Sequence, residues 1–315
     1  MSYDTKKIKP AAMNNQVEVT EIYVIADEFC KSFFELLNRQ LIDLGGDKKI
    51  RNKPCKLSDS EVITILVLFH LRGFRCLKHF YLNYVQQHMK GDFPKTVSYN
   101  RFVELSQKSI IPMVLLMKTM MREKCTGISF IDSTALKVCN NRRIHNHKVF
   151  KGIAERGHCS VGYFFGFKLH IIINEKGELL SYALTKGNKH DGNQELVNDL
   201  VKDLFGKLYG DKGYLSKALF ENLFHQGIHV VTKIRSNMKN CLMSLKDKIM
   251  LRKRAVVECV NDELKNICQI EHSRHRSFNN FIANLVSGLI AYCFLPKKPS
   301  INVIFENQKQ LVLLP

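Results

Sequence analysis

Several features of secreted and membrane proteins are missing from this 315-residue sequence. It has no tryptophan and only 7 prolines, and its 10 cysteines include no C-x-x-C pair. This cysteine usage is typical of free thiols in a reducing compartment rather than of a disulfide framework. The segment Met1–Asn15 is polar and lacks the apolar region of a signal peptide. We therefore expect an intracellular, cytoplasmic protein.

A long uninterrupted apolar run is also lacking. The most apolar stretch, Phe281–Leu295, is broken by Asn284 and Ser287. It is too short to cross a bilayer and predicts a core helix instead.

Acidic residues are scarce relative to basic ones. Lys and Arg number 48 against 29 Asp and Glu, which gives a formal charge of +19 and a pI near 9.5. A surface chosen only for solubility could carry such an excess. However, a field this positive on a chain with an ordinary apolar content favours a polyanionic partner, and nucleic acid is the commonest.

The first part of the chain, to about residue 125, has the patterns of short helices. Ser58 stands three positions before Glu61, which is a capping box, and the apolar run Val62–Phe69 follows. A second helix start lies at Ser98. Short helices joined by polar turns suit a DNA-binding bundle and a structural cap almost equally well. We assign residues 1–125 to a helical N-terminal region that binds DNA.

From Ile128 onward the pattern changes to strands. Apolar runs predict three strands, at 128–131, 163–173 and 179–184. Helices and strands then alternate, at about 194–205, 207–210, 215–226 and 229–234, before two long helices at about 245–268 and 276–294. This order predicts an α/β (α+β) fold, namely an RNase H-like mixed sheet flanked by helices. We place that domain at 126–296 and a tail at 297–315.

The segment 135–162 has no periodicity, and we interpret it as a basic loop between the first two strands. It carries one acid, Glu155, against a cluster of cations that extends just beyond it: Lys137, Arg142, Arg143, Lys148, Lys151, Arg156 and Lys168.

Two aspartates directly follow predicted strands. Asp132 comes after 128–131, and Asp211 comes after 207–210. Ligands in open α/β sheets gather at the carboxyl ends of strands, so the two side chains can converge on one site. Either aspartate alone would more often be a turn or helix-cap residue, and it is the pair that indicates a site.

Glu258 is the third candidate. Arg254, Glu258, Asn261 and Lys265 recur at steps of four, three and four, so they share one helical face. On a lone helix such a stripe is more often a solvated surface. In a chain expected to bind DNA, a carboxylate between two cations is typical of a metal ligand flanked by phosphate-binding residues.

Three carboxylates suit one particular chemistry. Mg²⁺ binds through a few carboxylates together with substrate phosphate oxygens. Two such ions, about 3.5–4 Å apart, stabilise the attacking and leaving oxygens of a displacement at phosphorus. We therefore expect Asp132, Asp211 and Glu258 to be catalytic and to hold two Mg²⁺ ions, with Mn²⁺ able to substitute.

These residues resemble the D-D-E triad of bacterial insertion-sequence transposases. Tyr209–Tyr214 is similar to the family's D-x-G-Y neighbourhood, and Gly187–Asp191 resembles its G-N-x-H-D run. Arg254-x₃-Glu258-x₆-Lys265 is similar to its R-x₃-E-x₆-K motif. Among subgroups, the sequence most resembles the insertion sequence 982 family. It departs at Leu251, where the family often has a tyrosine, so a stacking role there is in doubt.

The resemblance implies a transposase that cleaves DNA at the terminal inverted repeats of an element and joins the freed 3′-hydroxyl to target DNA. Arg254 and Lys265 would contact phosphates, and Lys212, Arg142 and Arg143 are further DNA-binding candidates. His190 and Asp191 would support the metal ligands or the fold. Pairing two ends of double-stranded DNA implies a homo-oligomer.

Other interpretations stay open. A zinc-stabilised DNA-binding protein without catalysis would use His145, His147, His158 and Cys159, although their spacing matches no common zinc site. An RNase H-like nuclease without strand transfer would share the same triad. An inactive transposase copy would also have this sequence.

Overall fold

The computed structural model describes residues 19–43, 55–159, 162–214, 216–233, 243–271 and 274–301. Calls on the first 18 residues and on most of the tail at 297–315 therefore lie outside the described residues. None of the described helices is long and apolar enough to cross a membrane.

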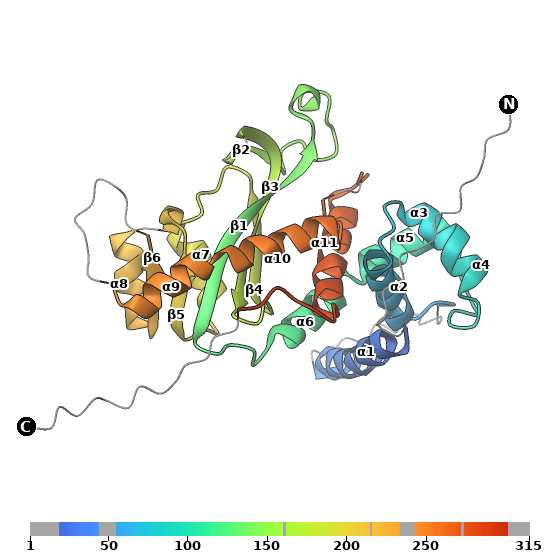
Figure 1. The fold of residues 1–315 in the computed structure, drawn as a ribbon. Helices are drawn as coiled ribbons and strands as arrows, with labels where there is room; N and C mark the ends of the chain where they lie inside the picture. Colours follow the sequence, from blue (N-terminus) through green and yellow to red (C-terminus); the bar gives the residue numbers. More distant parts are fainter. Residues whose placement is uncertain are drawn as a thin grey trace, which may run out of the picture.

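The N-terminal region is helical, as predicted (Figure 1). Its elements are α1 (Val19–Asp43), α2 (Asp59–Leu71), α3 (Leu77–His79), a π-helical stretch η1 (Phe80–Val85), α4 (Gln86–His88), α5 (Tyr99–Lys108) and α6 (Ile110–Met121). The capping box is confirmed, because the Ser58 side chain accepts from the Glu61 backbone while Glu61 accepts from the Ser58 backbone. Ser98 caps α5 in the same way, by accepting from the Arg101 backbone.

One mixed sheet forms the second half of the molecule. Its strands are β1 (Ile128–Cys139), β2 (Glu155–Cys159), β3 (Gly162–Asn174), β4 (Leu179–Lys186), β5 (Gly206–Gly210) and β6 (Ile228–Thr232). The order is β2-β3-β1-β5-β6, with β4 paired to β3. β1, β3 and β4 are antiparallel, whereas β5 and β6 run parallel to β1. The predicted RNase H-like mixed sheet is confirmed.

The strand prediction was wrong around the basic segment. β1 does not end at Asp132 but continues to Cys139, because its residues from Ser129 onward pair with β3. Part of the expected loop is the additional strand β2, which pairs with the first half of β3. The segment between β1 and β2 contains the short 3₁₀ helix η2 (Asn141–Arg143) and turns.

Helices cover both faces of the sheet. On one face, α7 (Gln194–Val201) and α8 (Lys217–His225) bury leucines and valines against Ile131, Ile172 and Leu208. On the other face lie α9 (Leu245–Lys253), α10 (Ala255–Asn266) and α11 (Phe278–Cys293). Neighbouring residues of β1 point to opposite faces of the sheet. Ile131 belongs to the core under α7 and α8, whereas Phe130 belongs to the core on the α10 side.

Helix α11 joins the two halves of the molecule. It packs against α2, α5 and α6 of the N-terminal region and against α10. Phe281 stacks on Phe167 of β3 with ring centroids 5.0 Å apart. Buried side chains of α1, α2, α5, α6, α9, α10 and α11 and of one face of the sheet form one continuous core. The helical region and the sheet are therefore held together by a shared interior.

A buried histidine strengthens this junction. His70 of α2 hydrogen bonds through its ring nitrogens to the Cys268 carbonyl and, at 3.0 Å, to the Ser287 hydroxyl of α11. Burial lowers the pKa of His70 to about 4. The ring is therefore neutral near pH 7, and its role is to link α2, α11 and the segment that follows α10.

Candidate active site

The sheet register places the two predicted aspartates at the same level. β1 and β5 pair in parallel up to Phe130 and Tyr209. Asp132 and Asp211 each come two residues later. A Cβ added at Gly210, the last residue of β5, would lie 3.1 Å from Ile131 Cγ2, so the end of β5 lies directly beside β1. The expectation that both aspartates lie at one edge of the β1–β5 pair agrees with this register.

The two aspartates differ in environment. The Asp132 side chain is 22% exposed and lies under α10. Asp211 is exposed, and within the described residues its side chain makes no hydrogen bond or ion pair. Asp132 is therefore held in place, while the Asp211 carboxylate is available to a ligand.

Helix α10 turns its polar stripe toward β1. Asn261 is buried, and the Lys265 ammonium donates to the Ala135 carbonyl of β1 at 2.6 Å. Val257, Val260 and Leu264 fill the core on the other side of the helix. The stripe is therefore not an ordinary solvated surface, although the sequence alone favoured that interpretation for a lone helix.

Arg254 lies between the two acids that the sequence assigned to the site. It occupies the break between α9 and α10, where a single long helix was expected. One guanidinium nitrogen lies 3.4 Å from Asp132 Oδ1 and the other lies 2.7 Å from Glu258 Oε1. Glu258 is otherwise open to solvent, with a side chain that is 57% exposed. Asp132 and Glu258 are thus brought together around one positive charge.

Asn261 supplies a second contact to Asp132. Its side-chain amide donates to Asp132 Oδ2 at 3.0 Å. Arg254 and Asn261 therefore each hold one oxygen of this carboxylate. Sequence analysis placed Asn261 on the correct face but assigned it no role, because its partner is 129 residues away in the chain.

The electrostatics of Asp132 are unusual for an aspartate. Burial raises its pKa to about 6, and Arg254 opposes that rise. The nearby carboxylates Glu258 and Asp191 raise the pKa further. A buried, partly compensated carboxylate surrounded by other acids is typical of a functional site rather than of a folding contact. The arrangement favours an additional cation.

Tyr214 is buried near Asp132 and Asp191. It ends the 3₁₀ turn η3 (Lys212–Tyr214) that directly follows Asp211, and it is almost fully buried. Burial raises the pKa of its phenol well above the ordinary value, and the charges of Asp191 and Asp132 raise it further. Its hydroxyl therefore stays protonated. The D-x-G-Y motif contained this residue, but the sequence did not show that it lies near Asp132.

Asp191 lies in the site, whereas His190 supports the chain beside it. Asp191 pairs with Lys168 of β3 at 3.0 Å, and that ammonium also donates to the Lys189 carbonyl. The His190 ring accepts from the Gly192 backbone at 3.1 Å, which shapes the turn. His170 of β3 is buried beneath them, and burial lowers its pKa to about 4.

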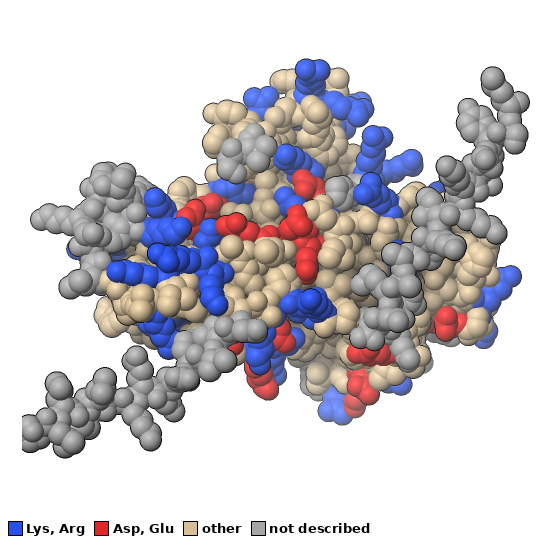
Figure 2. All heavy atoms as spheres, in the orientation of Figure 1, with Lys and Arg blue, Asp and Glu red and all other residues tan. Residues whose placement is uncertain are grey.

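The remaining predicted DNA-binding residues lie in two places, Lys265 and Lys212 next to the acids and Arg142 and Arg143 beyond the end of β1. Lys265 contacts Glu271 at 3.3 Å in addition to β1. Lys212 is exposed directly after Asp211, and Arg142 and Arg143 are exposed on η2 beyond the end of β1. Figure 2 shows acidic side chains gathered in the middle of this face, with lysines and arginines on both sides of them. A phosphate backbone crossing the acids would meet cations on either side.

The fit of this site to metal ions depends on its donors. Within the ranges that the structure describes, no group of three His, Cys, Asp or Glu side chains lies in a metal-binding arrangement. Asp132 and Glu258 nevertheless already share a cation, the Arg254 guanidinium, and Asp211 has carboxylate oxygens free at the same sheet level. Hard oxygen donors of this kind suit Mg²⁺ or Mn²⁺.

Two other sequence expectations can be located. Leu251 is buried in the core, so no stacking group replaces the missing tyrosine at that position. The candidate zinc ligands are divided between different surroundings. His147 packs against Phe150 and Phe165, whereas His158 packs against Tyr163.

One family model matches the part of the chain that contains the sheet and these acids. Residues 122–278 match the family described as "Transposase DDE domain". The segment that matches this DDE transposase model contains the whole sheet and α10. No curated protein matches the chain significantly in sequence.

Solved structures of transposases are among those that match this chain. A piggyBac transposase synaptic complex with hairpin DNA is 13% identical, with 87% of this chain and 71% of that chain covered and a TM-score of 0.47. The Mos1 strand transfer complex is 15% identical, with 70% and 78% covered and a TM-score of 0.22. The Mos1 paired-end complex with the left transposon end is 16% identical, with 70% and 69% covered and a TM-score of 0.23. At these TM-scores the likenesses add nothing to the family match.

Proposed function

We propose that this protein is a transposase of an insertion sequence, most like the insertion sequence 982 family, that acts in the bacterial cytoplasm. It would cleave double-stranded DNA at the element's terminal inverted repeats and join the freed 3′-hydroxyl to target DNA. The observation that supports this most directly is the geometry of the acids. Asp132 and Asp211 each come two residues after the last pair of β1 and β5, and Glu258 is linked to Asp132 through Arg254, all within the segment that matches the DDE transposase domain.

Each residue then has a defined task. Asp132, Asp211 and Glu258 would hold two Mg²⁺ ions, which when bound supply the positive charge that balances the attacking and leaving oxygens. Asn261 would keep Asp132 oriented. Arg254 would leave its carboxylate partners when metal is bound and bind a DNA phosphate instead, since guanidinium suits either anion. Lys265 and Lys212 would fix the strand beside the acids.

Alanine variants of the three acids test this proposal. Incubating the protein with Mg²⁺ and DNA that carries its own element ends should give 3′-end cleavage followed by strand transfer. Asp132→Ala, Asp211→Ala and Glu258→Ala should each abolish cleavage almost completely, and combining them should add little because the three act as a unit. DNA binding should persist in all of them. Mn²⁺ should support cleavage, and Ca²⁺ should permit binding with little cutting.

Matched controls come from acids outside the site. Glu221 forms an exposed ion pair with Lys217 on α8, and Asp262 is exposed on α10 and accepts from Asn266. Their alanine variants should keep most activity. Glu263 is a poorer control, because burial raises its pKa and one of its oxygens is buried. Robust cleavage by Asp211→Ala, or full activity in a chelator, would contradict the proposal.

The same assay separates the nearest alternative. A nuclease that shares the three acids would cut the element ends but would form no joined product with target DNA.

Because two ends must be held at once, we also propose that the active form is a homo-oligomer on DNA. Sedimentation of the protein with and without paired ends would show a change in subunit number.

A further inference from the structure

A cavity lies beyond the acids, at the far end of β1. It has a volume of about 410 Å³ and is enclosed by the end of β1, the segment 140–150 and the residues that follow α10. Lys137 of its wall is five residues after Asp132 on the same strand, which corresponds to about 16 Å. Lys265 lies between the two regions, because it contacts Ala135 and the cavity residue Glu271. The cavity is thus separate from the acids but adjoins them.

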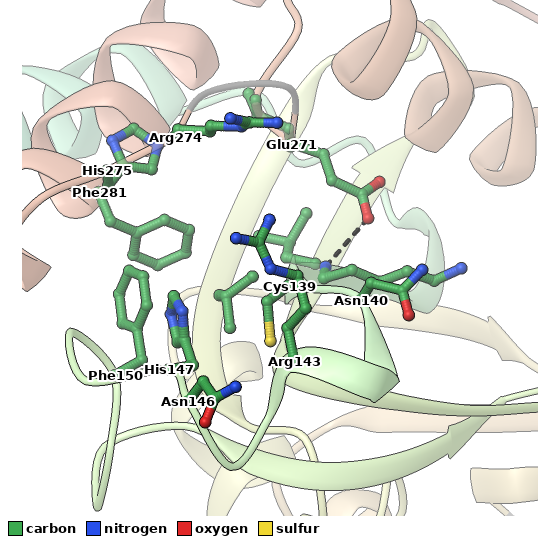
Figure 3. A pocket seen from close by; sticks show the side chains of 14 residues that line it. Cys139, Asn140, Arg143, Asn146, His147, Phe150, Glu271, Arg274, His275 and Phe281 are labelled. Atoms are coloured by element: carbon green, nitrogen blue, oxygen red, sulfur yellow. Dashed lines mark hydrogen bonds between the residues drawn. The ribbon is translucent and has the colours of Figure 1, made fainter.

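The cavity is rich in uncompensated positive charge. Arg143 and Arg274 line it from different segments, and Figure 3 shows both guanidinium groups in the pocket. Among the described residues, neither arginine forms an ion pair. The one acid in the wall, Glu271, is already engaged by Lys265 at 3.3 Å and by the Lys137 backbone at 3.0 Å. Two free guanidinium groups facing one space are suited to a phosphate.

The opposite side of the cavity is aromatic. The His147 ring stacks on Phe150 with centroids 5.5 Å apart, and the His275 ring meets the edge of Phe281 at 5.6 Å. Figure 3 shows these four rings together on one side of the arginines. Burial lowers the pKa of His275 to about 4, so its ring is neutral near pH 7.

We propose that this cavity receives a single unpaired nucleotide of DNA. Its phosphate lies between Arg143 and Arg274, and its base lies against the rings of His147 and His275. The volume favours a whole nucleotide, because a phosphate alone would leave most of 410 Å³ empty. The position, about 16 Å from Asp132, corresponds to about five nucleotides along a strand at 3.4 Å each. The inference relies on the proposed function only in taking DNA as the ligand.

Binding of three synthetic duplexes in a chelator tests this without any cleavage. One duplex is fully paired, one carries a single unpaired thymidine as a bulge, and one carries an abasic unit at the bulge. Fluorescence anisotropy at one fixed salt concentration gives the three affinities. The bulged duplex should bind about tenfold more tightly than the paired one, since stacking of a base on an aromatic ring contributes on this scale. The abasic bulge should lose most of that preference.

Variants identify the cavity as the source of the preference. Arg143→Ala and Arg274→Ala should each reduce the ratio of bulged-duplex affinity to paired-duplex affinity to near 1. His147→Ala should also reduce this ratio while leaving binding to the paired duplex unchanged. Arg142→Ala is the matched control, because Arg142 is the exposed neighbour of Arg143 but does not line the cavity. It should weaken binding to all three duplexes equally.

Several results would overturn the inference. These are equal affinity of the wild-type protein for paired and bulged DNA, equal affinity for the abasic and thymidine bulges, or loss of the preference in Arg142→Ala. Thermal unfolding of each variant excludes a folding defect as the cause. Failure of cleavage with an intact bulge preference would count against the proposed function alone, and the reverse result would count against the cavity alone.

Discussion

Replacement of Asp132 by asparagine should make the protein more stable while destroying its function. Burial of the carboxylate, reinforced by Glu258 and Asp191, raises its pKa from 3.8 to about 6 despite Arg254. The folded protein therefore favours the protonated form of this side chain. Asparagine has the same shape, carries no charge, and can still accept from Asn261.

The size and pH dependence of the effect follow from this shift. An acid with a raised pKa binds its proton more tightly in the folded than in the unfolded state, so wild-type stability falls as the pH rises from about 4 to about 6 and is then constant. A difference of about two pKa units corresponds to about 3 kcal/mol. The variant should therefore exceed the wild type by up to about 3 kcal/mol at about pH 7.5 and by little at about pH 4.

Urea unfolding of both proteins at the two pH values, in a chelator, measures this difference. In thermal unfolding the gain at the higher pH should be about 5 °C. Asp199→Asn is the control, because Asp199 forms an exposed pair with Lys202 and its replacement should change little at either pH. A variant that is equally or less stable than the wild type at the higher pH would refute the reasoning, as would a difference independent of pH.

Three further results are expected. Asn261→Ala should weaken Mn²⁺ binding and cleavage by about 10- to 100-fold and leave DNA affinity unchanged, because a group that orients a metal ligand is lost. Calorimetric titration with Mn²⁺ measures this, and Asn266→Ala, at the exposed end of α10, is the control. Tyr209→Phe should lower the free energy of unfolding by about 1.5–3 kcal/mol in urea, because the buried hydroxyl donates to the Asp247 carboxylate at 2.8 Å. Duplex affinity should fall steeply between low and moderate salt in anisotropy titrations, as release of counterions from DNA requires, and a salt-independent affinity would show that the basic excess makes no phosphate contacts.

The fold was largely predictable because its signals are local. Capping at Ser58 and Ser98, and alternating helices and strands after residue 190, depend on residues close together in the chain. The length of β1 was not predictable, because Ser133 and Thr134 look like a turn. Pairing with β3 residues that lie far along the chain overrides that local preference. The same partner strand also accounts for the unexpected β2.

The sequence selects residue types for the candidate site but does not show the contacts between them. Motif spacing selected Asp132, Asp211 and Glu258, and the helical period put Asn261 on the same face. The link from Arg254 to Asp132 spans 122 residues, and no sequence period shows it. The cavity with Arg143 and Arg274 is further from prediction, because it forms only where the end of β1, the segment after it and the residues beyond α10 meet.

The interior shared through α11 affects how such a protein can change over time. Because α11 packs on α2, α5 and α6 as well as on α10, the helical region is not an independent module that could be exchanged between transposases by recombination. N-terminal helices taken from another protein would have to pack on the apolar face of α11. They would also need a residue that takes the place of His70 and hydrogen bonds to Ser287. Change in this region should therefore be confined to the exposed residues of these helices, with the buried residues retained. Truncation of the first 110 residues would uncover α11, so point variants of exposed residues are the better test of whether these helices bind DNA.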